Sequence, residues 1–448
     1  MSQPRDVANE QVLARQLSSA QQAMMALGGA IGTGLFLASG LSVNVAGPAV
    51  VFSYVIAATI SWLLGRALIE MAVVHPTAGA FGVYAGVYVS PFAGYAVRVS
   101  YWLMQVIATG GQLVAASIYM GYWFPAVPGA LWVLAFAAAL LLMNSRAVGR
   151  LGAIEYWLVM IKIVAVVLFV AAMAAVVAGL TGAPAVGLRN ITGGDGFAPF
   201  GIRGVWLGVC FTIYSFIGVE IVAVTSGEAS NPSETIPKAM RRMILGLSAI
   251  YVVTIALLVA STPWKQLGVG ESPFVSGLAR LGIPGAAGLM NFVVLSAALS
   301  SANANLYLIA RTLFSLARAG FVPPALGAVT KRGAPVNALL VSGIGLGAAV
   351  LVRALWPDSA YVWFFGVALF GALFVWLMIF VTNIAFRASR GARTPWGSWL
   401  GGSLVFGILA STWFVPDLRS TLTAGVPWLL LLVVGYRVSR RQQDPASV

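Results

Sequence analysis

Long apolar runs recur along nearly the whole of this 448-residue chain, and each is long enough to cross a lipid bilayer. Hydrophobic residues make up 60% of the sequence and charged residues only 8%. A soluble domain does not need so much apolar side chain, whereas a protein with many membrane spans does. We therefore predict an all-α integral membrane protein with about twelve transmembrane helices, near residues 20–43, 47–72, 91–122, 129–146, 151–179, 203–226, 239–262, 285–316, 336–355, 359–386, 397–415 and 421–437.

The net charge of +14 could indicate a nucleic-acid partner, but the distribution of the charge indicates membrane topology instead. With the N-terminus in the cytoplasm, most of the 26 lysines and arginines fall on the cytoplasmic side of the spans, among them Arg146, Arg150, Lys238, Arg241 and Arg242. This is the positive-inside bias. It predicts that both termini are cytoplasmic and that no nucleic acid is bound.

A glycine-rich stretch, Gly28 to Phe36, interrupts the middle of the first run. Glycine costs about 1 kcal/mol in a helix interior, and an unwound backbone in hydrocarbon leaves polar groups without water. We interpret the stretch as a helix break that binds a ligand through Ile31, Gly32, Thr33 and Gly34, because the new helix start suits a carboxylate. The alternative is a Gly-x-x-x-Gly packing face formed with Gly28.

The sixth run carries Ile217-Gly218 at mid-span, which echoes Ile31-Gly32 in the first run. Five spans separate the starts of the two units, so the two glycine-bearing spans cross the membrane in opposite directions. This pattern is typical of an inverted repeat in which two discontinuous helices meet at the membrane midplane.

A break at Gly218 would leave the carbonyl groups of Tyr214, Ser215 and Phe216 at a negative helix end, which suits an ammonium group. The two aromatic rings could close over a ligand, or they could simply pack in the core. Glu220 is a candidate site residue because a carboxyl group within a span is costly. Its alternative role is to accept hydrogen bonds from the backbone of its own broken helix.

Further polar residues lie within other spans. Lys162 stands deep in the fifth run, where burial disfavours the charged amine, so it could load and release a proton. Glu155 lies on a similar face nearer the cytoplasm; a permanently paired, structural Lys162 is the alternative. Hydrogen bonding between helices is the simpler reading of the remaining polar side chains, which are Gln105, Gln112, Ser300, Ser301, Asn303 and Asn305.

Several short motifs stand in a specific order along the chain. They include Ala26 to Phe36, Ala46-Gly47-Pro48, Glu70-Met71-Ala72-Val73, Glu155-Tyr156-Trp157, Gly227 to Pro232, and Lys331 to Val336. With these motifs the chain resembles, over nearly its whole length, an amino acid permease of the amino acid–polyamine–organocation superfamily. Within that superfamily it is similar to the bacterial amino acid transporter family.

The resemblance implies a LeuT-like fold with broken first and sixth helices. Residues 20–179 and 203–387 would be the two inverted repeats and 396–437 the last two spans, with cytoplasmic tails at 1–19 and 438–448. It also implies that the glycines of the first span bind the substrate carboxylate, that carbonyls of the sixth bind the amine, and that Lys162 couples transport to protons.

One position departs from the family pattern. Many members of the family carry an acidic residue where this chain has Gln112. Gln112 is therefore also a candidate substrate-binding residue, and we do not expect a preference for cationic amino acids. We predict import of a neutral or aromatic amino acid by proton symport and alternating access, in a bacterial inner membrane. The expected partners are the amino acid, protons and membrane lipids, with no cofactor and no metal.

Two other functions stay open in the sequence. The chain could exchange one amino acid for another without net proton movement. It could also be a membrane amino acid sensor that transports nothing, which is disfavoured because no cytoplasmic domain is evident to relay a signal. An enzyme is disfavoured further, because the single histidine, His75, lies in a loop and no nucleophile–histidine–acid set is evident. The oligomeric state is not indicated.

Overall fold

The computed structural model describes residues 30–77, 79–146, 151–181, 184–224, 231–268, 270–328, 336–393 and 395–443. Within these ranges the chain forms helices and connecting loops. The first half contains α3 (Thr33–Phe36), α4 (Ala38–Ala46), η1 (Gly47–Ala49), α5 (Val50–Val74), α6 (Ala80–Tyr88), α7 (Pro91–Gly121), α8 (Gly129–Arg146), α9 (Leu151–Ala178), α10 (Arg189–Thr192), α11 (Gly201–Thr212), η2 (Ile213–Phe216) and α12 (Ile221–Val224).

The second half continues the helical pattern. It contains α13 (Pro232–Ser261), η4 (Trp264–Gln266), α14 (Pro273–Ala279), α15 (Ala286–Arg318), η5 (Pro324–Gly327), α16 (Val336–Leu355), α17 (Ala360–Ser389), α18 (Trp396–Ser411), η6 (Thr412–Phe414), η7 (Pro416–Leu418) and α19 (Arg419–Gln443).

In the part of the chain that the structure describes, nine helical segments are long and apolar enough to cross a membrane. The sequence predicts about twelve. Part of the predicted first span lies outside the described residues, and α4, η1 and α5 join two predicted spans into one segment, Ala38–Val74. The helices at Gly129–Ser145 and α18 are shorter. The all-helical membrane architecture therefore agrees with the sequence, and the count of twelve and the inverted repeat stay predictions.

Local sequence explains where several helices begin. Ser90 caps α7 by accepting a hydrogen bond from the Ala93 N–H group at 3.1 Å, and Pro91 occupies the first turn, where its missing N–H is not needed. Ser272 caps α14 in the same way by accepting from the Phe274 N–H group. These caps anchor the helix starts independently of the apolar runs.

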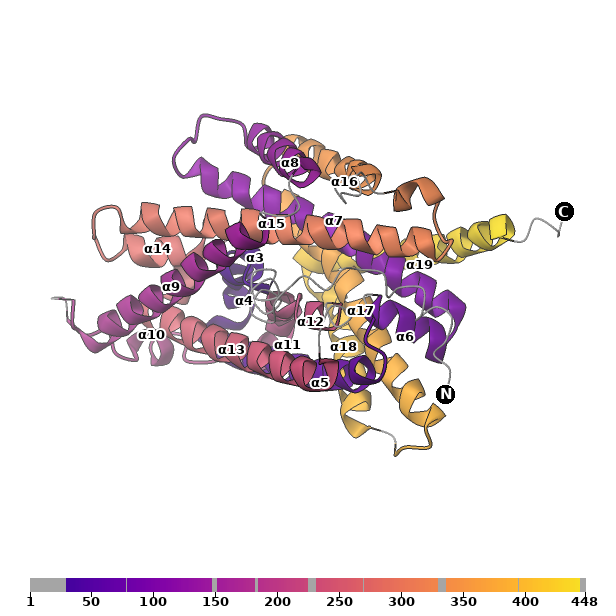
Figure 1. Ribbon diagram of the computed structural model, residues 1–448. Helices are drawn as coiled ribbons and strands as arrows, with labels where there is room; N and C mark the ends of the chain where they lie inside the picture. Colours follow the sequence, from indigo (N-terminus) through magenta and orange to yellow (C-terminus); the bar gives the residue numbers. More distant parts are fainter. Residues whose placement is uncertain are drawn as a thin grey trace.

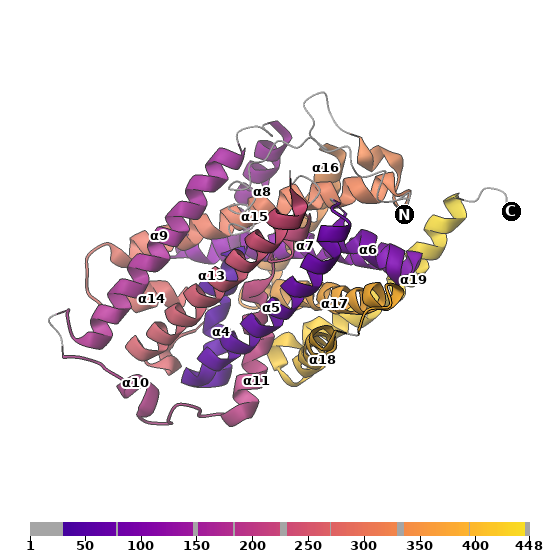
Figure 2. The same cartoon turned by 60° about the horizontal axis from the view of Figure 1, so that its bottom comes forward.

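The long helices surround a group of short ones. Figure 1 shows α3, α4, α11 and α12 in the middle of the molecule, between α15 on one side and α5 with α13 on the other. The turned view shows α13 between α5 and α9, and α13 contacts both of them (Figure 2). Most of α7 and α15 is buried, whereas less than a third of the apolar part of α9, α16 and α19 is buried, as expected for lipid-facing helices.

Candidate functional site

The first helix break lies at Ile31 and Gly32, where the backbone leaves the helical conformation before α3 begins at Thr33. The first amides of a helix have no partner inside that helix. Here the Thr33 N–H group donates to the Oε1 atom of Gln112 on α7 at 3.4 Å. A neutral amide oxygen therefore lies at the helix start that the sequence assigns to a carboxylate.

Side chains from three other helices hold the carbonyl groups of this break. The Tyr251 hydroxyl on α13 donates to the Ala30 oxygen at 3.1 Å. The Ser301 hydroxyl on α15 donates to the Ile31 oxygen at 3.3 Å. The Tyr361 hydroxyl on α17 donates to the Thr33 oxygen at 3.3 Å. The Ala30 and Thr33 oxygens also accept backbone hydrogen bonds from the Gly32 and Leu37 N–H groups, at 3.1 and 2.9 Å. The three hydroxyl groups add polar partners that help to hold the break within the apolar interior.

The second break follows η2. Ile217 is extended, with φ −64° and ψ 133°, and Gly218 adopts φ 110°, a conformation that only glycine reaches easily. The helix resumes as α12 at Ile221. The sequence prediction of a mid-span break at Ile217-Gly218 thus agrees with the backbone.

The two breaks lie against each other. A methyl group added at Gly34 would lie 2.9 Å from the Ser215 Cα atom, so the glycine allows the two backbones to touch. A methyl group added at Gly32 would lie 2.7 Å from the Ser301 Oγ atom and 3.1 Å from the Gln112 Nε2 atom. The fold therefore brings Gly32, Gly34, Gln112 and Ser215 together from three distant parts of the sequence.

An aromatic cluster borders this contact. The Tyr214 ring packs on Phe365 of α17, with ring centroids 4.3 Å apart, and Phe365 in turn faces Tyr361 at 6.1 Å. Tyr214 keeps 9% of its surface exposed, whereas Phe216 is fully buried against Tyr251 at 5.3 Å. Phe216 therefore packs in the core, and of the two candidate gate residues only Tyr214 keeps any exposed surface.

Glu220 is fully buried and braces the second break. Its Oε2 atom accepts hydrogen bonds from the Gly218 N–H group at 3.0 Å and from the Trp376 Nε1–H group on α17 at 3.4 Å. The first contact is the local structural role that the sequence leaves open for this residue. A direct role of Glu220 in substrate binding stays a prediction.

The two residues expected to handle protons lie on α9. Lys162 is fully buried and has an interaction partner. Glu155 belongs to the helical part of α9, but its side chain lies outside the described residues. The coupling role of both residues stays a prediction.

The polar side chains assigned to interhelical hydrogen bonding differ in the contacts that they make. Asn303 accepts a hydrogen bond from Asn144 at 2.8 Å and so joins α15 to α8. Gln105 donates to Tyr101 within α7 at 2.9 Å. Gln112 and Ser301 are different, because both contact the first break. No group of metal-binding side chains is found among the described residues.

Sequence reasoning missed four residues of the site: Tyr251, Tyr361, Phe365 and Trp376. Each is an aromatic side chain within a long apolar run, and such residues are usually core residues. No local pattern distinguishes them. Only the three-dimensional contacts with Ala30, Thr33, Tyr214 and Glu220 identify them.

Comparison with known proteins gives a consistent result. The model of a family described as amino acid permease matches residues 21–446. The chain is 34% identical over 440 residues to the uncharacterized amino acid permease YtnA of Bacillus subtilis (strain 168), covering 95% of each chain. It is 34% identical over 443 residues to the gamma-aminobutyric acid permease of the same organism, covering 96% of this chain and 94% of that protein. It is also 34% identical over 434 residues to the aromatic amino acid transport protein AroP of Escherichia coli (strain K12), covering 95% of each chain.

Proposed function

This chain belongs to the amino acid permease family, and we propose that it imports a neutral or aromatic amino acid by proton symport, through alternating access. The observation that carries the proposal is the contact between the two helix breaks. Gly34 and Ser215 bring a helix start and the carboxyl end of η2 to one place. A helix start attracts a carboxylate, and the negative end of a helix attracts an ammonium group, so the pair suits the backbone of an amino acid.

The side chains around this contact support the substrate class. Gln112 supplies a neutral amide, and Tyr214, Tyr361 and Phe365 supply aromatic surface. Glu220, the carboxylate nearest to the second break in sequence, already accepts hydrogen bonds from Gly218 and Trp376. This arrangement favours a neutral or aromatic substrate side chain over a cationic one. Two relatives are named for aromatic amino acids and for gamma-aminobutyric acid, and both compounds belong in the test.

Proton coupling is supported by the burial of Lys162 in α9. An ionisable group within a membrane span is costly to keep charged and is by default a functional candidate. A change in its protonation would alter the interaction that it makes in this conformation. Loading and release of one proton in each transport cycle would then link substrate uptake to a pH gradient.

The test is counterflow in proteoliposomes. Vesicles preloaded with each of the twenty common amino acids, or with gamma-aminobutyric acid, are diluted into a labelled aromatic amino acid at equal pH. We expect uptake of label when the vesicles contain neutral or aromatic compounds, and further accumulation when the outside is made acidic. Counterflow without a response to the pH gradient would indicate exchange instead. Absence of counterflow with every compound would contradict transport.

A further inference from the structure

A pocket with charged residues in its lining lies away from the helix breaks, where α5, α17 and α18 come together. It has a volume of about 260 Å³, far more than the roughly 30 Å³ of one water molecule. Three arginines and one glutamate contribute to its lining, together with apolar and small polar side chains. The charged residues are Arg66, Glu70, Arg387 and Arg393.

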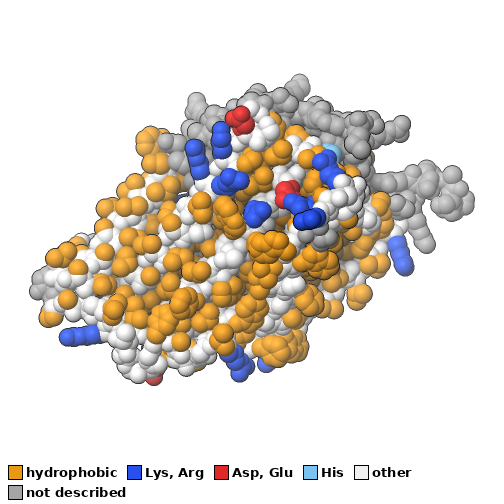
Figure 3. All heavy atoms as spheres, turned by 90° about the horizontal axis from the view of Figure 1, so that it is seen from below, with side chains coloured by type: hydrophobic (Ala, Val, Ile, Leu, Met, Phe, Trp, Pro, Cys, Tyr) orange, Lys and Arg blue, Asp and Glu red, His pale blue; other side chains and the backbone are white. Residues whose placement is uncertain are grey.

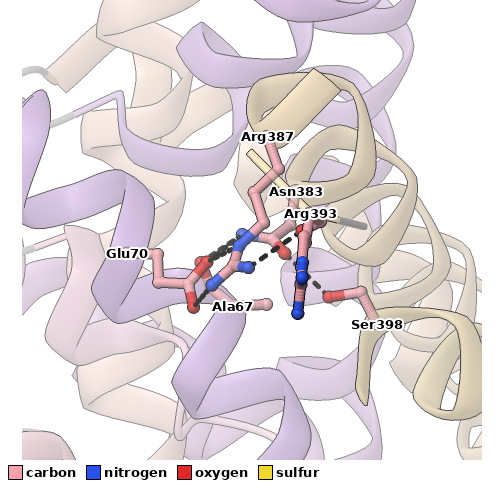
Figure 4. Close-up of polar contacts among 6 residues, drawn as sticks. All are labelled: Ala67, Glu70, Asn383, Arg387, Arg393 and Ser398. Atoms are coloured by element: carbon pink, nitrogen blue, oxygen red, sulfur yellow. Dashed lines mark hydrogen bonds and ion pairs between the residues drawn. The ribbon is translucent and has the colours of Figure 1, made fainter. Parts of the chain in front are cut away.

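An ion pair forms one wall of the pocket. Arg387 on α17 donates to both carboxylate oxygens of Glu70 on α5, from Nε at 2.8 Å and from Nη2 at 2.7 Å. Asn383 adds a hydrogen bond to the same carboxylate at 3.2 Å and accepts one from Ser398 of α18 at 2.8 Å. Figure 4 shows Glu70 and Arg387 pointing toward each other, with Ser398 and Arg393 on the far side. Among the described residues that line the pocket, the one carboxylate, Glu70, is thus already paired.

The other two guanidinium groups leave an excess of positive charge. Arg66 and Arg393 are both exposed, and neither side chain makes a hydrogen bond or a close ion pair with any described residue. Arg66 acts on Glu70 only through longer-range electrostatic attraction. A pocket with three guanidinium groups and one carboxylate attracts an anion, and phosphate oxygens suit the planar donor geometry of arginine.

The surroundings of the pocket are apolar. Trp396, which lines the pocket, and Trp399 on α18 expose 70% and 58% of their surface, and Leu400 exposes 42%. Exposed tryptophans are typical of the level at which a membrane meets water. Figure 3 shows a group of lysine and arginine side chains in the upper part of the view, beside a broad hydrophobic surface, and a few more at the lower edge. The anion that fits such a place carries its charge at the membrane surface and acyl chains below it.

We propose that this pocket binds the headgroup of an anionic phospholipid. Arg66 and Arg393 hold the headgroup phosphate, and the acyl chains lie along the exposed apolar side of α18 beside Trp396. The lipid thereby sits against the Glu70–Arg387 ion pair that joins α5 to α17. The site is separate from the two helix breaks and does not depend on which substrate is transported.

The test is thermal unfolding of the purified full-length protein in a neutral detergent, with added dioleoylphosphatidylglycerol. We expect the melting temperature to rise and saturate with this lipid. The R66Q/R393Q double variant should need at least tenfold more lipid for half the effect, since one basic residue near a membrane surface is worth about a fivefold change in affinity. Higher salt should weaken the wild-type response because exposed charges are screened.

The control variant is R241Q/R242Q, which removes two exposed arginines from α13, outside the pocket. It should keep the wild-type response to the lipid. If R241Q/R242Q and R66Q/R393Q lose the response equally, diffuse surface charge explains lipid binding and the proposal is overturned. Dioleoylphosphatidylcholine should barely change the melting temperature. If it raises the melting temperature as much as the anionic lipid does, binding does not require the arginines and the proposal is overturned. If inorganic phosphate alone raises the melting temperature as much as the lipid does and abolishes the effect of the lipid, the pocket is a phosphate site and not a lipid site.

A second measurement covers the case in which the double variant is unstable. Native mass spectrometry of the wild type, R66Q and R241Q then counts bound phosphatidylglycerol per protein. If R66Q binds fewer lipids than the wild type and R241Q does not, the result supports the site. Equal numbers of bound lipids in the three proteins contradict it.

Discussion

Gly34 matters because of the side chain that it lacks. Its position leaves room for the Ser215 backbone, and a β-carbon there would lie 2.9 Å from the Ser215 Cα atom. Backbone atoms cannot rotate away as the end of a flexible side chain can. The two helix breaks therefore touch only while this residue is glycine.

Gly34→Ala tests this contact. We expect the variant to insert in the membrane but to lose the rise in melting temperature that a transported amino acid gives the wild type. Gly246→Ala is the matched control, because a methyl group there meets no atom within 4 Å. If ligand stabilises Gly34→Ala and Gly246→Ala as strongly as it stabilises the wild type, the contact is not part of the binding site.

Tyr214 offers a second test at the scale of a single residue. Its ring packs on Phe365 at 4.3 Å and retains 9% exposure, so it can either cover a ligand or stabilise the core. We expect Tyr214→Ala to weaken substrate binding by about 1–3 kcal/mol if the ring contacts the ligand. Tyr214→Phe, which keeps the ring, should cost less. A lower melting temperature with unchanged affinity in both variants would assign Tyr214 to the core.

At the scale of elements, the breaks depend on helices remote in sequence. α13, α15 and α17 each supply one hydroxyl group to the backbone of the first break, and α17 supplies Trp376 to the second through Glu220. Since α17 contributes to both, its position relative to α5 should influence the whole site. The Glu70–Arg387 ion pair is one contact that fixes this position.

Removing that ion pair should destabilise the protein moderately. Both side chains are about 30% exposed (30% and 29%), so solvent screens part of the attraction even though the pair is bidentate. We expect Arg387→Gln to cost about 1 kcal/mol, measured as a lower melting temperature. Glu70→Gln completes a double-mutant cycle. If the losses of stability in the two single variants simply add in the double variant, the two residues do not stabilise each other.

The α5–α6 junction gives a pH-dependent prediction. His75 follows α5; its Nε2 atom shares a hydrogen bond with the Tyr88 hydroxyl, and its carbonyl oxygen accepts one from Tyr84 at 2.7 Å. Burial, and secondarily the charge of Arg390, lowers the pKa of His75 below its ordinary value of 6.5. The folded state thus prefers neutral histidine, while the unfolded chain takes up a proton near pH 6.5.

The stabilisation linked to His75 is therefore complete above pH 6.5 and is lost as the pH falls below it. We expect the melting temperature of the wild type to drop between pH 7 and pH 5.5. His75→Gln should show a smaller drop because it cannot be protonated. An identical pH dependence in both proteins would assign the effect to other groups.

At the scale of the whole molecule, the buried central helices carry the candidate site, and the outer helices α9, α16 and α19 face outward. Lys162 lies on one of these outer helices and is nevertheless fully buried, so its side chain points into the protein. Its proposed role in proton coupling is tested by the following substitution.

Lys162→Ala should separate coupling from binding. The change removes the ionisable group and leaves the glycine and carbonyl groups of the two breaks in place. We expect accumulation driven by an imposed pH gradient to be lost, while counterflow at equal pH persists in part. If the variant still concentrates substrate in response to the gradient, Lys162 is structural, and Glu220 becomes the residue to test next.

The sequence by itself determined the class of protein, the family and the place of both helix breaks. The length of an apolar run predicts a membrane span because a bilayer has a set thickness. The glycines at 32, 34 and 218 predict helix breaks that lie inside the protein, because unwound backbone is unstable where hydrocarbon surrounds it. The family resemblance drawn from the motifs is confirmed by the match over residues 21–446. All of these signals are local in the chain.

Only the tertiary structure decided what surrounds the breaks. Tyr251 lies 221 residues from Ala30, and Tyr361 lies 328 residues from Thr33, yet each holds the carbonyl group of its partner. Nothing near these tyrosines in sequence distinguishes them from core aromatics. Their role follows from which helices pack together, because a buried carbonyl group must find a donor wherever the fold supplies one.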